Sequence, residues 1–203
     1  YNYLKETPNV VKNITFLTKG ETKGLFKNVK DLMLYRISST INSGTDNIII
    51  SMLLGLNPLA IYNNYYYILA ALINVTTIII NSIQAGIGNS IITDNEQILF
   101  DNYKRFRFFV YNAVLFMCIC LCMLYQPFMK IWMGESMLLP DTSMIIFVVC
   151  FYITQTRRVV TTYKNAAGLW KEDFFKPYIW IIVDIILDFI LIPKYGIIGA
   201  ILS

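Results

Sequence analysis

Histidine is absent from the 203 residues, and cysteine occurs only four times. The missing histidine removes the most common general base of enzymes. The thiols all fall in apolar runs, so we interpret them as reduced packing residues. The alternation "CICLC" scatters three of them around a helix, so we expect no metal ion or cofactor. They are Cys118, Cys120, Cys122 and Cys150.

Charge is also scarce, since 15% of the residues are charged, 56% are hydrophobic and the mean hydropathy is +0.54. Such a chain is too apolar for an ordinary soluble domain and indicates a multi-pass membrane protein. The net charge of +4 comes from basic residues between apolar segments, which is typical of topology signals and not of nucleic-acid binding. The polar start "YNYLKETPNVVKN" lacks the apolar core of a signal peptide.

The fold class that follows is an all-α, polytopic transmembrane helix bundle with about five complete spans and the start of a sixth. A span needs about 20 apolar residues, and an open sheet cannot satisfy its edges in lipid. Breaks are expected at "GLNP", at "GIGN" and at Pro193. Residues 1–30 form a cytoplasmic amphipathic linking segment, and residues 31–203 form the bundle, a fragment of a longer chain. The predicted spans are 32–54, 59–84, 106–128, 141–163 and 178–192, with the sixth starting near Gly196.

Lysine and arginine alternate between rich and poor connections along the chain, which predicts the orientation of the bundle. Residues 91–106 and 157–176 carry most of the basic residues in the connections and are expected to be cytoplasmic. Residues 55–58, 130–140 and 193–195 carry few and are expected on the opposite side.

Polar side chains line one face of each of the first two predicted helices, at spacings of three, four and seven. On the first helix the stripe is Arg36, Thr40, Ser43, Asn47 and Ser51, with Ser39 and Asp46 beside it. On the second it is Asn64, Tyr67, Asn74, Asn81 and Gln84. The stripes predict a hydrated cavity between the helices. Two alternatives stay open: hydrogen bonds that join packed helices, and snorkelling of Arg36 to the interface.

Two carboxylates in "VDIILD", Asp184 and Asp188, are spaced i and i+4 and so share one helix face. Close carboxylates in an apolar setting repel each other, so one holds a proton or the pair shares a cation. We predict an ion-coupling site that includes Asp184, Asp188 and Asp46. The alternative for Asp188 is that it reaches the outer interface.

Several blocks of the chain resemble the polysaccharide flippases of bacterial inner membranes, relatives of the multidrug and toxin extrusion transporters. The blocks are "KNVKDLMLYRISSTINSGTDNIIISMLLGL", "YNNYYYI", "NSIQAGIGNSI", "PFMKIWMGE", "NAAGLWKEDFFKP" and "KYGIIGAIL", which together extend over residues 27–202. They look like most of the second half of such a transporter. The acidic pair in "VDIILD" departs from that family, which usually has uncharged polar residues there.

The resemblance implies two pseudo-symmetric bundles that enclose a central cavity and carry an undecaprenyl-diphosphate-linked oligosaccharide from the cytoplasmic to the periplasmic leaflet. Such a protein works in lipopolysaccharide or O-antigen synthesis beside a polysaccharide polymerase and glycosyltransferases. A glycan needs hydroxyl and amide partners, which the stripes offer, and the diphosphate needs cations. The candidate cations are Arg36, Arg157, Arg158 and Lys164, of which the last three serve equally well as topology signals. Tyr62, Tyr65, Tyr66 and Tyr67 are candidates for stacking on sugars or for an interfacial belt.

A nucleotide-binding G-x-x-x-x-G-K-[ST] loop does not occur, which makes an ion gradient the expected energy source. A related exporter of drugs or other small molecules is the first alternative. The second is a membrane-embedded glycan polymerase or glycosyltransferase. Scattered carboxylates, short connections and the missing histidine argue against an enzyme.

Overall fold

The computed structural model describes residues 44–168 and 176–203, and these residues form helices and short turns with no strand among them. The predicted all-α class is therefore confirmed. Arg36, Ser43 and the segment 1–30 lie outside the described residues. The elements are a helical stretch at residues 44–53, α4 (Leu56–Thr93), α5 (Glu96–Met133), the short 3₁₀ helix η1 (Glu135–Met137), α6 (Asp141–Ala166), α7 (Lys176–Tyr195) and α8 (Ile197–Leu202).

Three of the described helices, α4, α5 and α6, are long and apolar enough to cross a membrane. The protein is therefore a multi-pass membrane protein. With 38 residues each, α4 and α5 are about 57 Å long at 1.5 Å per residue, well beyond the roughly 30 Å of a hydrocarbon core. Their ends extend past the apolar layer or the helices tilt. The predicted total of five complete spans stays a prediction.

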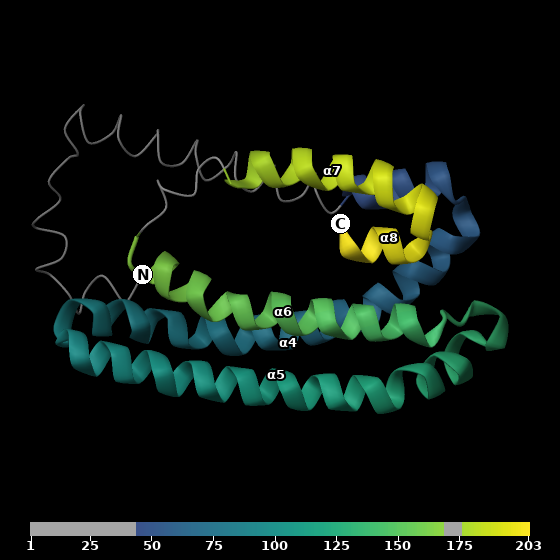
Figure 1. The fold of residues 1–203 in the computed structure, drawn as a ribbon. Coiled ribbons are helices and arrows are strands. Elements are labelled where there is room, and N and C mark those ends of the chain that lie inside the picture. Colours follow the sequence, from purple (N-terminus) through teal and green to yellow (C-terminus); the bar gives the residue numbers. More distant parts are fainter. Residues whose placement is uncertain (1–43, 169–175) are drawn as a thin grey trace, which may run out of the picture.

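The helices form two groups in Figure 1. α4, α5 and α6 run side by side, and each contacts the other two. α7 packs on α8, and α8 in turn contacts α6. α8 therefore joins the two groups.

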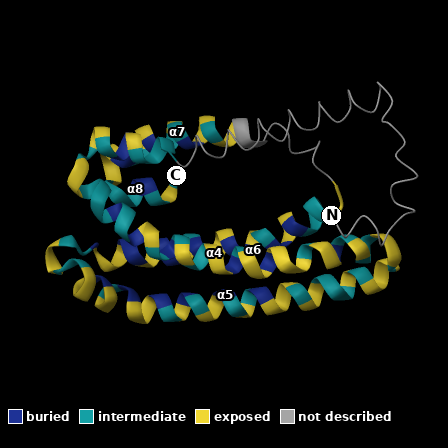
Figure 2. Ribbon diagram, turned by 180° about the vertical axis from the view of Figure 1, so that it is seen from behind, coloured by how far each residue is buried: buried dark blue, intermediate teal, exposed yellow. Residues whose placement is uncertain are grey.

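Burial is confined to the faces that the helices turn toward each other, while the outward faces carry exposed apolar side chains (Figure 2). Tyr65, Val114 and Val159 are fully buried, one from each of α4, α5 and α6. By contrast, Ile131 is 88% exposed. Apolar groups facing outward in this way are stable in lipid, which is the surface expected of a membrane bundle.

The Tyr65 hydroxyl fastens the loop between α5 and α6 to α4. It donates to Oε1 of Gln126 at 2.7 Å and accepts the backbone N–H of Leu139 at 3.1 Å. Gln126 then donates through Nε2 to the carbonyl of Leu139 at 2.7 Å and to Oδ1 of Asp141 at 3.1 Å. Buried polar groups need such partners, so this end of the bundle is held by a closed hydrogen-bond network.

Two predicted helix ends are wrong. α4 runs through "GIGN" to Thr93, because nothing in that stretch removes a backbone donor and an interior glycine costs only about 1 kcal/mol. The predicted cytoplasmic connection 91–106 is accordingly mostly helix, broken only at residues 94–95. α7 likewise continues past Pro193 to Tyr195, since one missing donor in the last turn leaves the remaining hydrogen bonds intact.

Two glycines allow sharp turns between consecutive described helices. Gly55 separates residues 44–53 from α4 with φ 94°, and Pro58 follows in the first turn of α4, where no backbone donor is needed. Gly196 has φ 60° between α7 and α8. This turn brings Gly199 so near to α7 that a Cβ there would lie 2.4 Å from the backbone carbon and oxygen of Leu191.

Candidate functional site

Three aspartates from opposite ends of the chain meet where residues 44–53 approach α7. Asp46 belongs to the first of these segments, and Asp184 and Asp188 belong to α7. One carboxylate oxygen from each lies within 4.8 Å of the others. Asp188 is fully buried and Asp184 is 8% exposed, while Asp46 is half-buried. We call these three residues the aspartate cluster.

The carboxylates of the aspartate cluster have free acceptor capacity. Among the described residues, Oδ1 of Asp46, Oδ2 of Asp184 and both oxygens of Asp188 are buried without a hydrogen-bond partner. The ion pairs in this part of the chain, Lys104 with Asp101 and Lys130 with Glu135, do not involve the cluster. Buried polar atoms are normally satisfied, so these oxygens have the capacity to accept a proton or a cation.

Electrostatics favours a compensating positive charge at the aspartate cluster. The three carboxylates have oxygens within 4.8 Å of one another. At that separation two unit charges repel by about 3.5 kcal/mol even at an effective dielectric constant of 20. Protons or a bound cation must offset this repulsion when the cluster is buried. Carboxylate oxygens are the ligands that hard cations prefer, so the residues present fit a cation as well as protons.

The sequence pattern accounts for half of this arrangement. The i, i+4 spacing in "VDIILD" places Asp184 and Asp188 on one face of α7, as predicted. The approach of Asp46 depends on how the first described helix packs against α7, which no local pattern encodes. The structure thus brings together the three residues named for ion coupling, and the coupling itself stays a prediction.

The polar residues predicted to line a cavity are dispersed by comparison. Oδ1 of Asn47 is buried without a hydrogen-bond partner among the described residues, and Asn64 is half-buried. Tyr67, Asn74 and Asn81 lie on the exposed face of α4, and Tyr67 contacts the ring of Trp132 at a centroid distance of 6.3 Å. Their role in binding a glycan stays a prediction.

The two arginines proposed for the diphosphate turn to different neighbours. Arg157 is exposed and lies over the ring of Trp180 in α7, with its Cζ 5.6 Å from the centroid. Arg158 is half-buried and donates to the Thr77 hydroxyl of α4. Lys164 lies in the last turn of α6. These contacts do not gather the three basic side chains around one phosphate. Their role in substrate binding stays a prediction.

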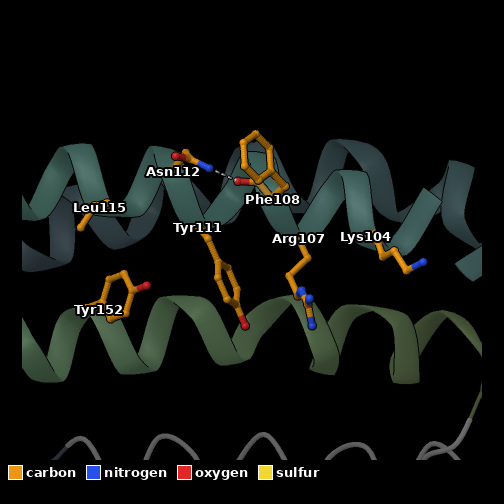
Figure 3. A pocket seen from close by; sticks show the side chains of 7 residues that line it. All are labelled: Lys104, Arg107, Phe108, Tyr111, Asn112, Leu115 and Tyr152. Carbon is orange, nitrogen blue, oxygen red and sulfur yellow. Dashed lines mark hydrogen bonds between the residues drawn. The ribbon is translucent and has the colours of Figure 1, made fainter. Parts of the chain in front are cut away.

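A pocket of about 540 Å³ lies between α5 and α6. Figure 3 shows that Arg107 and Tyr111 point from α5 toward α6, and that Tyr152 points back from α6. The remaining lining residues are Lys104, Phe108, Asn112 and Leu115. Sequence reasoning treated the basic residues here as topology signals, and only their spacing next to aromatic rings could have suggested a pocket.

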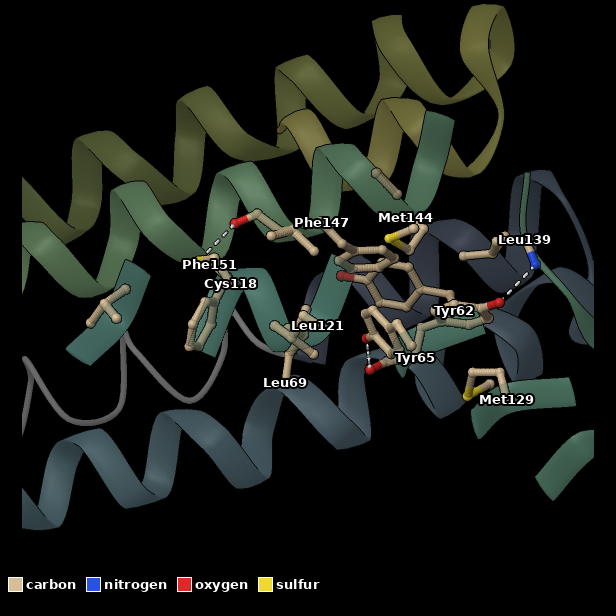
Figure 4. Close-up of a cluster of buried hydrophobic side chains, with 14 of the residues drawn as sticks. Tyr62, Tyr65, Leu69, Cys118, Leu121, Met129, Leu139, Met144, Phe147 and Phe151 are labelled. Atoms are coloured by element: carbon tan, nitrogen blue, oxygen red, sulfur yellow. Dashed lines mark hydrogen bonds between the residues drawn. The ribbon is translucent and has the colours of Figure 1, made fainter. Parts of the chain in front are cut away.

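Of the four tyrosines that were candidates for stacking on sugars or for an interfacial belt, Tyr62 and Tyr65 are not exposed. Both are buried in the core shown in Figure 4, where each ring packs against Phe147. Tyr65 is inaccessible because its hydroxyl finds partners inside the bundle. Tyr66 and Tyr67 are exposed and keep the prediction open.

Gln155 was not anticipated. It is fully buried in α6, and its Oε1 accepts the Thr76 hydroxyl of α4 at 2.9 Å. Its Nε2 has no partner among the described residues. The signal in the sequence is a lone amide in "FYITQT", whose neighbours on the same helix face are mainly apolar.

The long apolar helices and the buried polar cluster define the class as a multi-pass membrane protein with an ionisable site inside its bundle. A family model described as polysaccharide biosynthesis protein matches residues 10–138. The chain belongs to this family, which is of the polysaccharide flippase type. The match ends before α6, so Asp184 and Asp188 lie beyond it. No curated protein and no solved structure matches the chain.

Proposed function

We propose that the protein moves a lipid-linked oligosaccharide across the bacterial inner membrane and that cation or proton binding at the aspartate cluster drives this movement. The substrate is an undecaprenyl-diphosphate-linked sugar for surface polysaccharide. The observation that carries the coupling is the buried meeting of Asp46 with Asp184 and Asp188. Membership of a polysaccharide biosynthesis family supports the substrate class.

The cluster can couple ion binding to a movement of the helices because it joins two helices that are far apart in sequence. When the carboxylates are charged and lack a cation, their repulsion drives residues 44–53 and α7 apart. Protons or a cation remove the repulsion and favour the packed arrangement. Binding therefore shifts the balance between two arrangements of the bundle by the difference in affinity for them, which is what ion-driven transport requires.

The proposal assigns no catalytic residue. Within the described residues the buried carboxylates gather at one place, where residues 44–53 approach α7. Export of a drug or another small molecule by the same coupling remains the competing function, and the substrate added to the assay distinguishes the two.

The test reconstitutes the full-length protein in liposomes with a fluorescent lipid-linked oligosaccharide and measures its movement with and without an imposed proton or sodium gradient. We expect Asp184→Asn to lose the acceleration by the gradient while still binding the substrate. Asp101→Asn, which changes a half-exposed carboxylate outside the cluster, is the matched control. If the gradient drives movement in Asp184→Asn at the unaltered rate, the coupling role is excluded. If a cationic drug moves and the oligosaccharide does not, the competing function is favoured.

A further inference from the structure

The pocket between α5 and α6 lies at a boundary of the apolar layer. Residues 108–129 of α5 contain no Asp, Glu, Lys or Arg. These 22 residues extend about 33 Å as a helix, which matches the thickness of a hydrocarbon core. Arg107 precedes this run directly and Lys130 follows it. Arg107 is thereby placed at one membrane interface, where basic side chains meet lipid head groups.

The pocket is charged at one end and apolar at the other. Lys104 and Arg107 lie on the polar side of the boundary, and Leu115 lies two helical turns deeper, about 12 Å along the axis. Phe108 is 72% exposed and Leu115 is 48% exposed, so the apolar part is open to the surrounding lipid. This gradient from charge to hydrocarbon matches an amphiphile lying parallel to α5.

The positive charge in the pocket is not neutralised by its neighbours. Arg107 forms no ion pair within the described part of the chain. Lys104 reaches Asp101 at 3.4 Å, but both side chains are about half exposed, and such surface pairs contribute little. A guanidinium has five N–H donors, and none of those of Arg107 binds a carboxylate among the residues described.

Aromatic rings hold Arg107 in place. Its Cζ lies 5.6 Å from the centroid of the Tyr103 ring and 6.0 Å from that of Tyr111. The Tyr103 ring meets the ring of Tyr163 in α6 edge to face, with centroids 5.0 Å apart. Because these contacts fix the guanidinium beforehand, an anion binds it with less loss of side-chain entropy.

We propose that this pocket binds one anionic phospholipid. The phosphodiester accepts hydrogen bonds from Arg107 and Lys104, an arrangement that suits a guanidinium fork. The hydroxyls of Tyr111 and Tyr152 lie beside the glycerol region, and an acyl chain follows Phe108 and Leu115. The Nδ2 of Asn112 is already bonded to the carbonyl of Phe108 at 2.8 Å. The volume of about 540 Å³ exceeds what a free phosphate would fill. This site is separate from the aspartate cluster and does not depend on the transported substrate.

Lipid retention on the purified full-length protein, measured by native mass spectrometry, tests the proposal. Phosphatidylglycerol and phosphatidylcholine with the same acyl chains are added in parallel. We expect the unaltered protein to retain phosphatidylglycerol preferentially, and the double variant Lys104→Gln with Arg107→Gln to bind it about tenfold more weakly, a loss of about 1.4 kcal/mol. The control Arg105→Gln with Lys130→Gln removes the same charge outside the pocket and should retain the lipid normally.

Two further arms separate the possible ligands. Leu115→Trp fills the apolar end without changing charge and should also weaken retention of phosphatidylglycerol, with an unchanged melting temperature in lipid-free detergent. Inorganic phosphate in excess should not displace the lipid. Equal retention of both lipids, an equal loss in the control variant, or full displacement by phosphate would each overturn the proposal.

Discussion

Tyr65 shows how much of the bundle depends on a single hydroxyl. Replacing it with phenylalanine leaves the Leu139 N–H and Oε1 of Gln126 without this partner. A buried group left unsatisfied costs about 1–3 kcal/mol, so we expect Tyr65→Phe to lower the melting temperature by several degrees. Thermal unfolding in detergent measures the change. Tyr66→Phe alters an exposed ring and should melt with the unaltered protein, and a Tyr65→Phe variant that did the same would show that the network contributes nothing.

At the residue scale the sequence predicts neighbours on one helix and misses partners on another. The spacing of Asp184 and Asp188 predicted their shared face. Whether a tyrosine is exposed or buried depends on whether its hydroxyl finds a partner, and for Tyr65 one of those partners is 74 residues away. Periodicity carries no information about such a contact. For this reason the sequence did not show that Tyr62 and Tyr65 are buried.

The crossing of α7 and α8 depends on the absence of a side chain at Gly199. A Cβ there would lie 2.4 Å from the backbone of Leu191 and 2.7 Å from the backbone nitrogen of Ile192, and backbone atoms cannot rotate away. We expect Gly199→Ala to lower the melting temperature by forcing the helices apart. The outcome is read by thermal unfolding.

Gly86→Ala provides the matched control, because nothing lies within 4 Å of a Cβ at Gly86 in α4. There the methyl group improves helix propensity and can raise the free energy of unfolding by up to about 1 kcal/mol. The melting temperature should therefore stay equal or rise. Equal effects of the two alanine variants would contradict the close crossing.

Helices were easier to predict than their ends. Long apolar runs predicted α4, α5, α6 and α7, since burial in lipid demands internal hydrogen bonding over the whole run. The ends depend on smaller terms. α5 begins at Glu96, ten residues before the predicted start. It begins there because Asn95 caps the helix, with its side chain accepting the backbone N–H of Ile98 at 2.9 Å.

Orientation belongs to the scale of the whole molecule. The two ends of α5 are marked by Asn95, its N-cap, and Ser136 in η1. In a variant with all four cysteines replaced, we expect Ser136→Cys to react with an impermeant thiol reagent in intact cells and Asn95→Cys to stay unlabelled, because the basic residues follow Asn95. Permeabilised cells supply the control, where both should react. Labelling of the second position alone in intact cells would invert the topology.

The architecture of the whole bundle could be predicted only in class. Composition excluded a soluble domain, and the quoted blocks indicated the polysaccharide flippase type that the family match supports. Which helices pair was beyond reach, since lipid-facing and protein-facing sides are both apolar in the core of a membrane bundle. The polar stripe of α4 illustrates this, because Asn74 and Asn81 are exposed in the described bundle although their pattern suggested an enclosed face.

The aspartate cluster also has a consequence for the order of biogenesis. Translation reaches Asp46 138 residues before Asp184. At a translation rate of about 5–20 residues per second, roughly 7–28 s pass between the synthesis of Asp46 and that of Asp184. During that interval a carboxyl group is inserted into the bilayer alone, at a cost of about 2.5–3.5 kcal/mol if it is ionised in the centre. The helix that carries Asp46 therefore enters as the neutral acid or stays near the translocon, and the arrival of α7 completes the aspartate cluster.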